Sequence, residues 1–176
     1  MRSVPRISME NMKKQVSLVL LAGLISGCAA NGRTYSEYLK SQVPLAPDSA
    51  RVVVYRSGDD SQGSGRDTRL SIDGKIVGKV AHMGFSTFEV PRGSHVIAAD
   101  LWDSPGACQL KFDARPNTDY YFEVTPRIET LAAGLLLGVV GQALESAGNE
   151  CGGSFAIAAQ PKRAATYALV PLRMTE

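Results

Sequence analysis

Three cysteines and two histidines are the residues of this chain with the most specific chemistry, because thiolates and imidazoles bind metals and act as nucleophiles or bases. His82 and His95 lie near expected turns, and neither falls in an HxxxH pattern or beside a CxxC pair. Ser94 precedes His95, but adjacency does not make a catalytic pair, and the chain has no GxSxG motif. We therefore expect no catalytic residues, no metal site and no cofactor. Both histidines are interpreted as exposed or structurally hydrogen-bonded.

Two other features are candidates for ligand binding. The stretch GDDSQGSGRD, Gly58 to Asp67, is acidic and glycine-rich but matches neither a phosphate-binding nor a calcium-binding loop. We expect a flexible hairpin loop there. Trp102 is a candidate for lining a ligand face, but a single tryptophan at a strand end is more typical of a half-buried core residue.

The stretch MKKQVSLVLLAGLISGC, which ends at Cys28, has the order of an export signal. Two lysines precede a mostly apolar run, and small residues stand before the cysteine. Fewer than about 17 apolar residues are too few for a transmembrane helix. Because the signal is complete from Met12, the start of the natural chain is open between Met1, Met9 and Met12.

The four residues Ile25-Ser26-Gly27-Cys28 resemble the lipobox of bacterial lipoproteins, in which cleavage falls before the cysteine and its sulfur carries a diacylglyceryl group. The alternative is an ordinary secretory signal with an incidental cysteine. The resemblance implies a signal peptide over residues 1–27 and two or three acyl chains, palmitate among them, on Cys28. Each buried methylene contributes about 0.8 kcal/mol, so several chains hold a protein permanently. In such lipoproteins an aspartate directly after the cysteine favours retention in the inner membrane. This chain has Ala29 and Ala30 there instead, which implies attachment to the outer membrane of a Gram-negative bacterium, facing the periplasm.

Charge argues against nucleic acid as a partner. The chain has 19 basic and 17 acidic residues, but residues 1–27 hold four of the former and one of the latter. The remaining 15 basic and 16 acidic residues give a net charge of −1, with no basic run that would form a patch for nucleic acid or anionic lipid.

Cys108 and Cys151 are left once Cys28 is acylated, so only one disulfide connectivity is available. An oxidising periplasm favours this bridge, and buried free thiols are the alternative. The bridge would close a loop of about 44 residues and stabilise the fold by up to about 4 kcal/mol.

The rest of the chain predicts a lipidated cysteine and tether over residues 28–49, with Pro44 and Pro47 favouring an extended conformation, and one domain over residues 50–176. Tyr35, Tyr38 and Leu39 are candidates for a short helical turn. Short alternating strands separated by turns follow, and they predict a mainly β fold, a small antiparallel β-sandwich. The stretches expected as strands are ARVVVYR, RLSID, KIVGKV, FSTFEV, HVIAADLW, CQLKF and YYFEV.

Strand alternation also predicts which side chains share a face. The sets expected to share a face are Leu70 and Ile72; Phe88 and Val90; Cys108, Leu110 and Phe112; and Tyr120, Phe122 and Val124. Asp73-Gly74 is a tight-turn signal between two strands.

The order of four pieces resembles a family of Gram-negative envelope lipoproteins, the domain of unknown function 2846. The pieces are a strand ending in Tyr55-Arg56, the hairpin IDGKIVGK, a turn with Pro91, Gly93 and His95, and a late strand with Tyr120-Tyr121. The resemblance covers about half of the chain and implies a transthyretin-like or PEGA-like sandwich without catalytic residues.

The uncharged run TLAAGLLLGVVGQAL, Thr130 to Leu144, predicts one C-terminal apolar helical segment. Such a helix would be about 22 Å long, which is too short to span a bilayer. It either packs on the sandwich or contacts a membrane or partner, self-association included, and small residues on one side would permit close approach. The candidate contact residues are Gly134, Leu137, Gly138, Val140, Gly141 and Leu144.

Together these patterns predict a non-enzymatic envelope lipoprotein that acts as an interaction or structural module, held to the membrane by its lipid. The alternative is an accessory protein that docks its glycine-rich apolar segment in a membrane or an envelope assembly. An envelope-polymer hydrolase is the third reading and would need a cleft that gathers His95, an acidic residue and a nucleophile.

Overall fold

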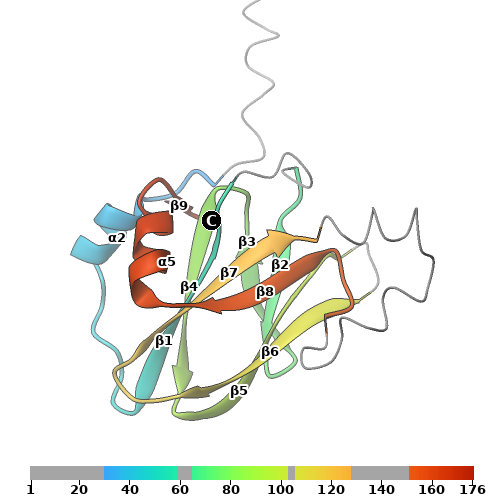
Figure 1. The fold of residues 1–176 in the computed structure, drawn as a ribbon. Coiled ribbons are helices and arrows are strands. Elements are labelled where there is room, and N and C mark those ends of the chain that lie inside the picture. The colour runs from blue at the N-terminus through green and yellow to red at the C-terminus, as the bar shows by residue number, and fades with distance from the viewer. Residues whose placement is uncertain (1–29, 59–64, 103–105, 128–150) are drawn as a thin grey trace, which may run out of the picture.

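The computed structural model describes residues 30–58, 65–102, 106–127 and 151–176, and the strands of these ranges form two packed sheets (Figure 1). The larger sheet has the spatial order β8 (Phe155–Gln160), β7 (Asp119–Pro126), β1 (Ser49–Arg56), β4 (Gly84–Pro91) and β9 (Arg173–Met174). The smaller sheet has the order β3 (Lys75–Val80), β2 (Thr68–Ile72), β5 (Gly93–Asp100) and β6 (Ala107–Ala114). The helices are α2 (Tyr35–Lys40) and α5 (Lys162–Leu169).

The predicted mainly β sandwich is confirmed, and each of the seven stretches expected as a strand forms one. Two strand pairs differ from a purely antiparallel arrangement, because β1 pairs in parallel with β7 and β4 in parallel with β9. The first parallel pair follows from the short crossing from β6 to the other sheet. Asn117 and Thr118, in that connection, hydrogen-bond to Ser49 and Arg51, so β7 begins beside the beginning of β1 and runs in the same direction.

The core between the sheets is formed by alternate strand residues, because neighbouring side chains on a strand point to opposite faces. The shared faces predicted from the sequence are confirmed. Buried in this core are Leu70, Ile72, Val90, Cys108, Phe122 and Val124, and partly buried against it are Phe88, Leu110, Phe112 and Tyr120.

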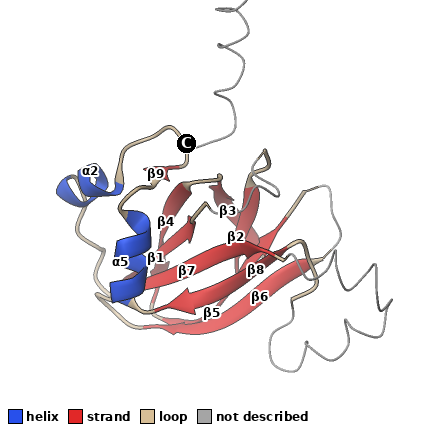
Figure 2. Cartoon of the chain, turned by 45° about the horizontal axis from the view of Figure 1, so that its top comes forward, coloured by secondary structure: helices blue, strands red, loops and turns tan. Residues whose placement is uncertain are grey.

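The outer face of the larger sheet carries a second apolar cluster, which the two helices cover (Figure 2). Phe85 of β4 contacts the rings of Tyr35 and Tyr38 of α2 at centroid distances of 5.5 and 5.6 Å. Leu169 of α5 is fully buried in the same cluster. The larger sheet is therefore covered on both faces.

The short helical turn expected near Tyr35 is helix α2, and it corrects the expectation of an extended tether over residues 28–49. Thr34 caps the helix, and Glu37 returns the hydrogen bond to complete a capping box. Two buried tyrosines bind the helix to the sheet, which offsets the entropy of ordering it. Only residues 41–48, mostly exposed, have the character of a linker.

The elements after residue 151 have no counterpart in the sequence prediction. FAIAAQ, which forms β8, is alanine-rich and shows little alternation of polarity, and β9 is only two residues long. Helix α5 buries only Ala165 and Leu169, too few to show a helical period in the sequence. The expected apolar helical segment over residues 130–144 lies outside the described residues.

Candidate functional site

The buried side chain of His95 is held in a clamp between two turns whose contacting residues, Asp73 and Pro91, are exposed. Its Nδ1 atom is 2.6 Å from a carboxylate oxygen of Asp73, and its Nε2 atom is 2.8 Å from the carbonyl oxygen of Pro91. Asp73 follows β2, and Pro91 ends β4, so the imidazole joins the smaller sheet to the larger one. The ring also packs beside Phe112, with ring centroids 5.7 Å apart.

The local sequence explains why Asp73 reaches the ring. Asp73 and Gly74 both have positive φ, 53° and 75°, as the centre of a two-residue hairpin turn of this kind requires. The second carboxylate oxygen of Asp73 accepts the Val96 N–H at 2.9 Å, and the Asp73 N–H donates to the Val96 carbonyl at 2.9 Å. The turn is thereby attached to β5, next to His95.

Both ring nitrogens of His95 face oxygen atoms that accept hydrogen bonds, and a neutral imidazole has only one N–H to donate. Burial disfavours the charged ring, but the hydrogen bonds to Asp73 and Pro91 outweigh it, and the pKa of His95 is raised. The hydrogen bond from His95, followed by that from the Val96 backbone, lowers the pKa of Asp73. The two contacts and the two shifts favour an imidazolium paired with a carboxylate.

This arrangement leaves His95 a structural role. Both ring nitrogens are already occupied by contacts to oxygen atoms of the protein. The interpretation of His95 as structurally hydrogen-bonded is thus confirmed. His82 is half-buried, and its backbone carbonyl accepts the Ala30 N–H. Within the described ranges, no group of three or more metal-ligating side chains comes together.

Trp102 is 75% exposed, which corrects its interpretation as a half-buried core residue. Strand β5 ends at Asp100, and the next residue, Leu101, takes the core position with 6% exposure. The indole therefore points to solvent. Of the acidic loop over residues 58–67, positions 59–64 lie outside the described residues.

Arg56 is a buried charged residue whose position sequence reasoning missed. It is fully buried at the end of β1, its guanidinium lies 4.6 Å from the centre of the Phe155 ring, and its Nη1 atom donates to the Arg66 carbonyl at 2.8 Å. It closes one end of the core between the sheets. Strand alternation places Arg56 on the same face as Val52 and Val54, but the charge of its side chain gives no reason to expect burial.

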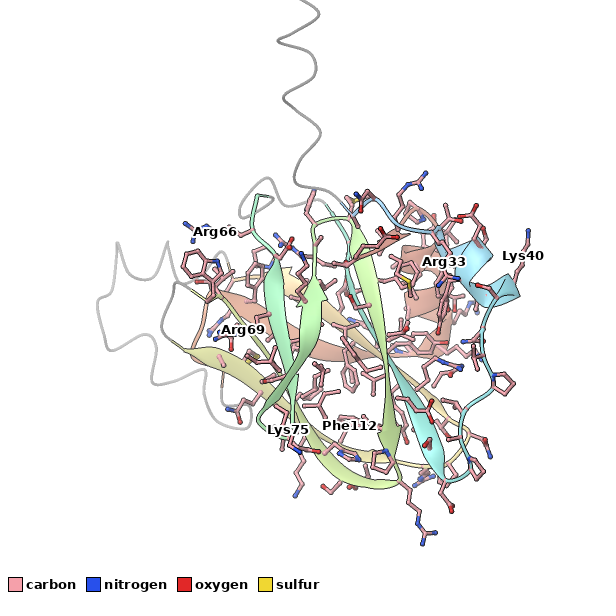
Figure 3. All side chains as sticks on the ribbon, turned by 180° about the vertical axis from the view of Figure 1, so that it is seen from behind. Arg33, Lys40, Arg66, Arg69, Lys75 and Phe112 are labelled. Atoms are coloured by element: carbon pink, nitrogen blue, oxygen red, sulfur yellow. A yellow bond between two sulfur atoms is a disulfide. The ribbon has the colours of Figure 1, made fainter. Side chains whose placement is uncertain are left out.

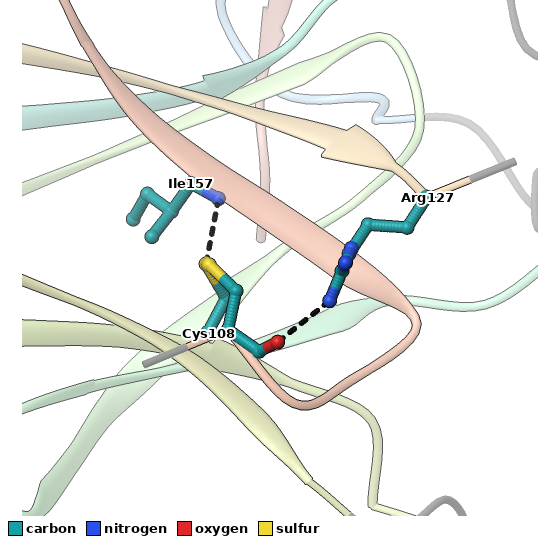
Figure 4. The surroundings of a disulfide bond; sticks show 4 residues. Cys108, Arg127 and Ile157 are labelled. Atoms are coloured by element: carbon teal, nitrogen blue, oxygen red, sulfur yellow. Dashed lines mark hydrogen bonds between the residues drawn. A yellow bond between two sulfur atoms is a disulfide. The ribbon is translucent and has the colours of Figure 1, made fainter. Parts of the chain in front are cut away.

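Cys108 and Cys151 form the predicted disulfide, which joins β6 to the chain leading into β8. Figure 4 shows its surroundings: the Ile157 N–H donates to the Cys108 sulfur at 3.3 Å, and Arg127 donates to the Cys151 carbonyl at 2.6 Å. The two cysteines also form an isolated antiparallel bridge in the backbone. The bridge thus extends from the core of the sandwich to its edge.

Cys28 lies outside the described residues, but the chain is fixed to the domain two residues later. The Ala30 N–H donates to the His82 carbonyl at 3.1 Å, and the Gly32 N–H to the Met174 carbonyl at 3.0 Å. Residues 30–34, which we call the N-terminal arm, continue along β9 through the bridge between Thr34 and Arg173. The arm thereby joins the edge of the larger sheet.

The candidate contact residues of the apolar run all lie outside the described residues: Gly134, Leu137, Gly138, Val140, Gly141 and Leu144. Among the helices that the structure describes, none is long and apolar enough to cross a membrane.

No family model matches the chain, and no curated protein matches it. A similar solved structure is the N-terminal domain of AlgF from P. aeruginosa, with 18% sequence identity and a TM-score of 0.34. The match covers 67% of this chain and 100% of that one.

Proposed function

We propose that this protein is an outer-membrane lipoprotein, anchored through Cys28, whose periplasm-facing sandwich is a non-enzymatic interaction or structural module. The observation that supports this most is the docking of the N-terminal arm. Ala30 hydrogen-bonds to the folded domain two residues after the cysteine of the lipobox-like sequence. A protein built in this way is positioned by its anchor.

The polar pairs of the domain agree with a scaffold role. His95 and Asp73 connect two turns, Arg51 and Asp119 connect β1 to β7 at 3.2 Å, and Arg69 and Asp100 connect β2 to β5 at 2.6 Å. Each pair joins one element of the sandwich to another. Their chemistry fixes the shape of the domain.

The lipidation is tested with Cys28→Ser in the full-length chain, followed by labelling with a radioactive or alkyne fatty acid and sedimentation of membranes. We expect the variant to lose the label and to leave the membrane fraction. The matched control is the double variant Cys108→Ser/Cys151→Ser, which removes two thiols but keeps Cys28 and should stay labelled. A Cys28→Ser protein that is labelled and sedimented like the native chain would contradict the proposal.

The module role is tested by crosslinking in intact envelopes and identification of the captured partner. An envelope protein that is captured with the native chain, and is lost when the domain is unfolded by core substitution, supports an interaction module. Turnover of an envelope polymer by the purified protein would argue for an enzyme instead.

A further inference from the structure

The anchor and the folded domain are separated by very little chain. An extended chain spans at most about 3.6 Å per residue, so Cys28 lies within about 7 Å of Ala30. Ala30 is fixed to the His82 carbonyl, and Gly32 to the Met174 carbonyl. A lipid on Cys28 therefore holds this side of the domain close to the bilayer.

The elements beside the N-terminal arm belong to the same side of the molecule. Met174 donates to the Arg33 carbonyl at 2.7 Å, and the Tyr35 N–H donates to the Leu172 carbonyl at 3.3 Å. Leu172 is joined to the end of α5 by two residues, Val170 and Pro171. Figure 1 shows α2, β9 and the C-terminal end of α5 next to one another.

The end of α5 carries two exposed apolar side chains on this side, and Leu39 of α2 is 47% exposed as well. Tyr167 is 85% exposed and Val170 is 70% exposed. They are three residues apart at the end of a helix, so they project from the same helical face. Single exposed apolar residues are ordinary, but Val170 lies two residues before Leu172, whose carbonyl accepts the N–H of Tyr35 directly after the N-terminal arm. Tyrosine is enriched where proteins meet the membrane–water interface.

Charge does not account for a membrane contact here. Arg33, Lys40 and Arg173 are exposed in or beside the arm and α2, and Glu37 and Glu176 are exposed near them. This side is therefore close to electrically balanced, and salt should have little effect on its contact with lipid.

We propose that the lipid-anchored domain rests on the bilayer surface through this side, with Tyr167 and Val170 in the headgroup region. The inference rests on the proposed lipidation of Cys28. The face that contacts the lipid, which we call the anchor face, consists of the N-terminal arm, Tyr167, Val170 and Met174. The opposite end of the sandwich, with the turn at Asp73-Gly74, then faces the periplasm and its partners.

The orientation is tested with the full-length lipidated protein in vesicles of phosphatidylethanolamine and phosphatidylglycerol that contain a headgroup-nitroxide lipid. Val170→Cys and Lys75→Cys each add one free thiol for a fluorescent label, because Cys28 carries the lipid and the other two cysteines are bridged. Lys75 is exposed at the beginning of β3, whose other end leads to His82, and the six residues of this strand span about 20 Å. Figure 3 shows Lys75 and Arg33 at opposite ends of the domain.

We expect the label at Val170→Cys to be quenched at least about twofold more than the label at Lys75→Cys, because interfacial contact reaches only about 5–10 Å from the headgroups. A twelve-residue Gly/Ser insertion after Ala29, with a root-mean-square span of about 20 Å, should make the two labels equal. High salt should leave the native difference unchanged.

Flotation of the vesicles in the same samples distinguishes a failure of the proposed lipidation from a failure of the proposed orientation. Protein that floats with the vesicles but shows equal quenching at both positions, without the insertion, overturns the orientation and leaves the anchor in place. A difference that disappears at high salt overturns the apolar contact. Protein that does not float overturns both the proposed lipidation and the orientation that rests on it.

Discussion

His95 and Asp73, both of the smaller sheet, lie 2.6 Å apart between the imidazole Nδ1 atom and a carboxylate oxygen, and the Nε2 atom of His95 faces the Pro91 carbonyl of the larger sheet. Asp73 comes from the hairpin turn between β2 and β3, and His95 comes from the beginning of β5. The hairpin places the carboxylate, and the Pro91 carbonyl holds the other side of the ring. His95, a residue type often found in catalytic sites, therefore has a structural role in this fold.

The pair predicts a pH-dependent stability. The raised pKa of His95 means that its contribution is complete below about pH 6.5, its value in the unfolded chain, and is lost as the pH rises through the higher folded value. The lowered pKa of Asp73 means that its contribution is present above about pH 3.9 and is lost as the pH falls through the folded value. We expect the pair to stabilise most between about pH 4 and 6.5.

Urea unfolding of a soluble form, residues 29–176, at several pH values measures this effect. His95→Gln should lose about 1–2 kcal/mol near pH 5.5 and show a flatter profile above pH 6.5. Hydrogen bonds to charged groups contribute about 1.5–3 kcal/mol, and solvent at the half-exposed Asp73 lowers this. Lys40→Gln, an exposed charge on α2 that contributes to neither pKa shift, is the control and should keep the profile. Identical pH profiles for native protein and His95→Gln would contradict a charged clamp.

The disulfide predicts a second stability difference. Replacing both Cys108 and Cys151 by alanine should lower the free energy of unfolding by up to about 4 kcal/mol, because the open unfolded chain gains the entropy of a loop that spans 43 positions. Denaturant curves of the soluble form with and without reductant measure it. The native protein should move to lower denaturant on reduction, and the double variant should not respond. Equal curves for oxidised and reduced native protein would remove the bridge as a source of stability.

The strands could be predicted because their cause is local. Leu70 and Ile72, or Phe122 and Val124, alternate with polar residues, and a strand with one buried face requires this pattern. The Asp73-Gly74 turn is equally local, since its two positive φ angles favour these residue types. Cysteine counting gave the disulfide partners because only one pairing was left.

The remaining features depend on contacts between residues distant in sequence. Helix α2 is stabilised by the packing of Tyr35 and Tyr38 on Phe85, about 50 positions later in the chain. No local sequence pattern indicates that this face of the sheet is available for packing. The inward position of Arg56 depends on Phe155, a hundred residues away. The His95 clamp needs the hairpin and the β4–β5 turn to meet, which only the packing of two sheets brings about. Candidate residues were therefore recognisable, but their partners were not.

The capping box of α2 predicts that the docking of the N-terminal arm depends on Thr34. Its hydroxyl accepts the Glu37 N–H at 3.3 Å, and its own N–H donates to the Glu37 carboxylate at 2.8 Å. Thr34→Ala should cost about 1 kcal/mol of stability and increase hydrogen exchange at the amides of Ala30 and Gly32. Lys40→Ala, an exposed position of the same helix, is the matched control with a change within about 0.5 kcal/mol. Exchange at these amides that is unchanged in Thr34→Ala would show that the arm is held without the cap.

Helix α5 permits a comparison between two of its own residues. Leu169 is fully buried against the outer face of the larger sheet, and Tyr167, two positions earlier, is 85% exposed. Leu169→Ala should lower the free energy of unfolding by about 2–5 kcal/mol, because it removes buried methylenes and leaves a cavity beside Phe85 and Tyr121. Tyr167→Ala should change it by no more than about 0.5 kcal/mol in the soluble form. In the lipidated protein on vesicles, the same Tyr167→Ala should weaken quenching of a label at Val170→Cys, since the proposed contact loses its aromatic member. Comparable losses of stability from both substitutions in the soluble form would mean that Tyr167 packs against the domain, and it would no longer be available for lipid.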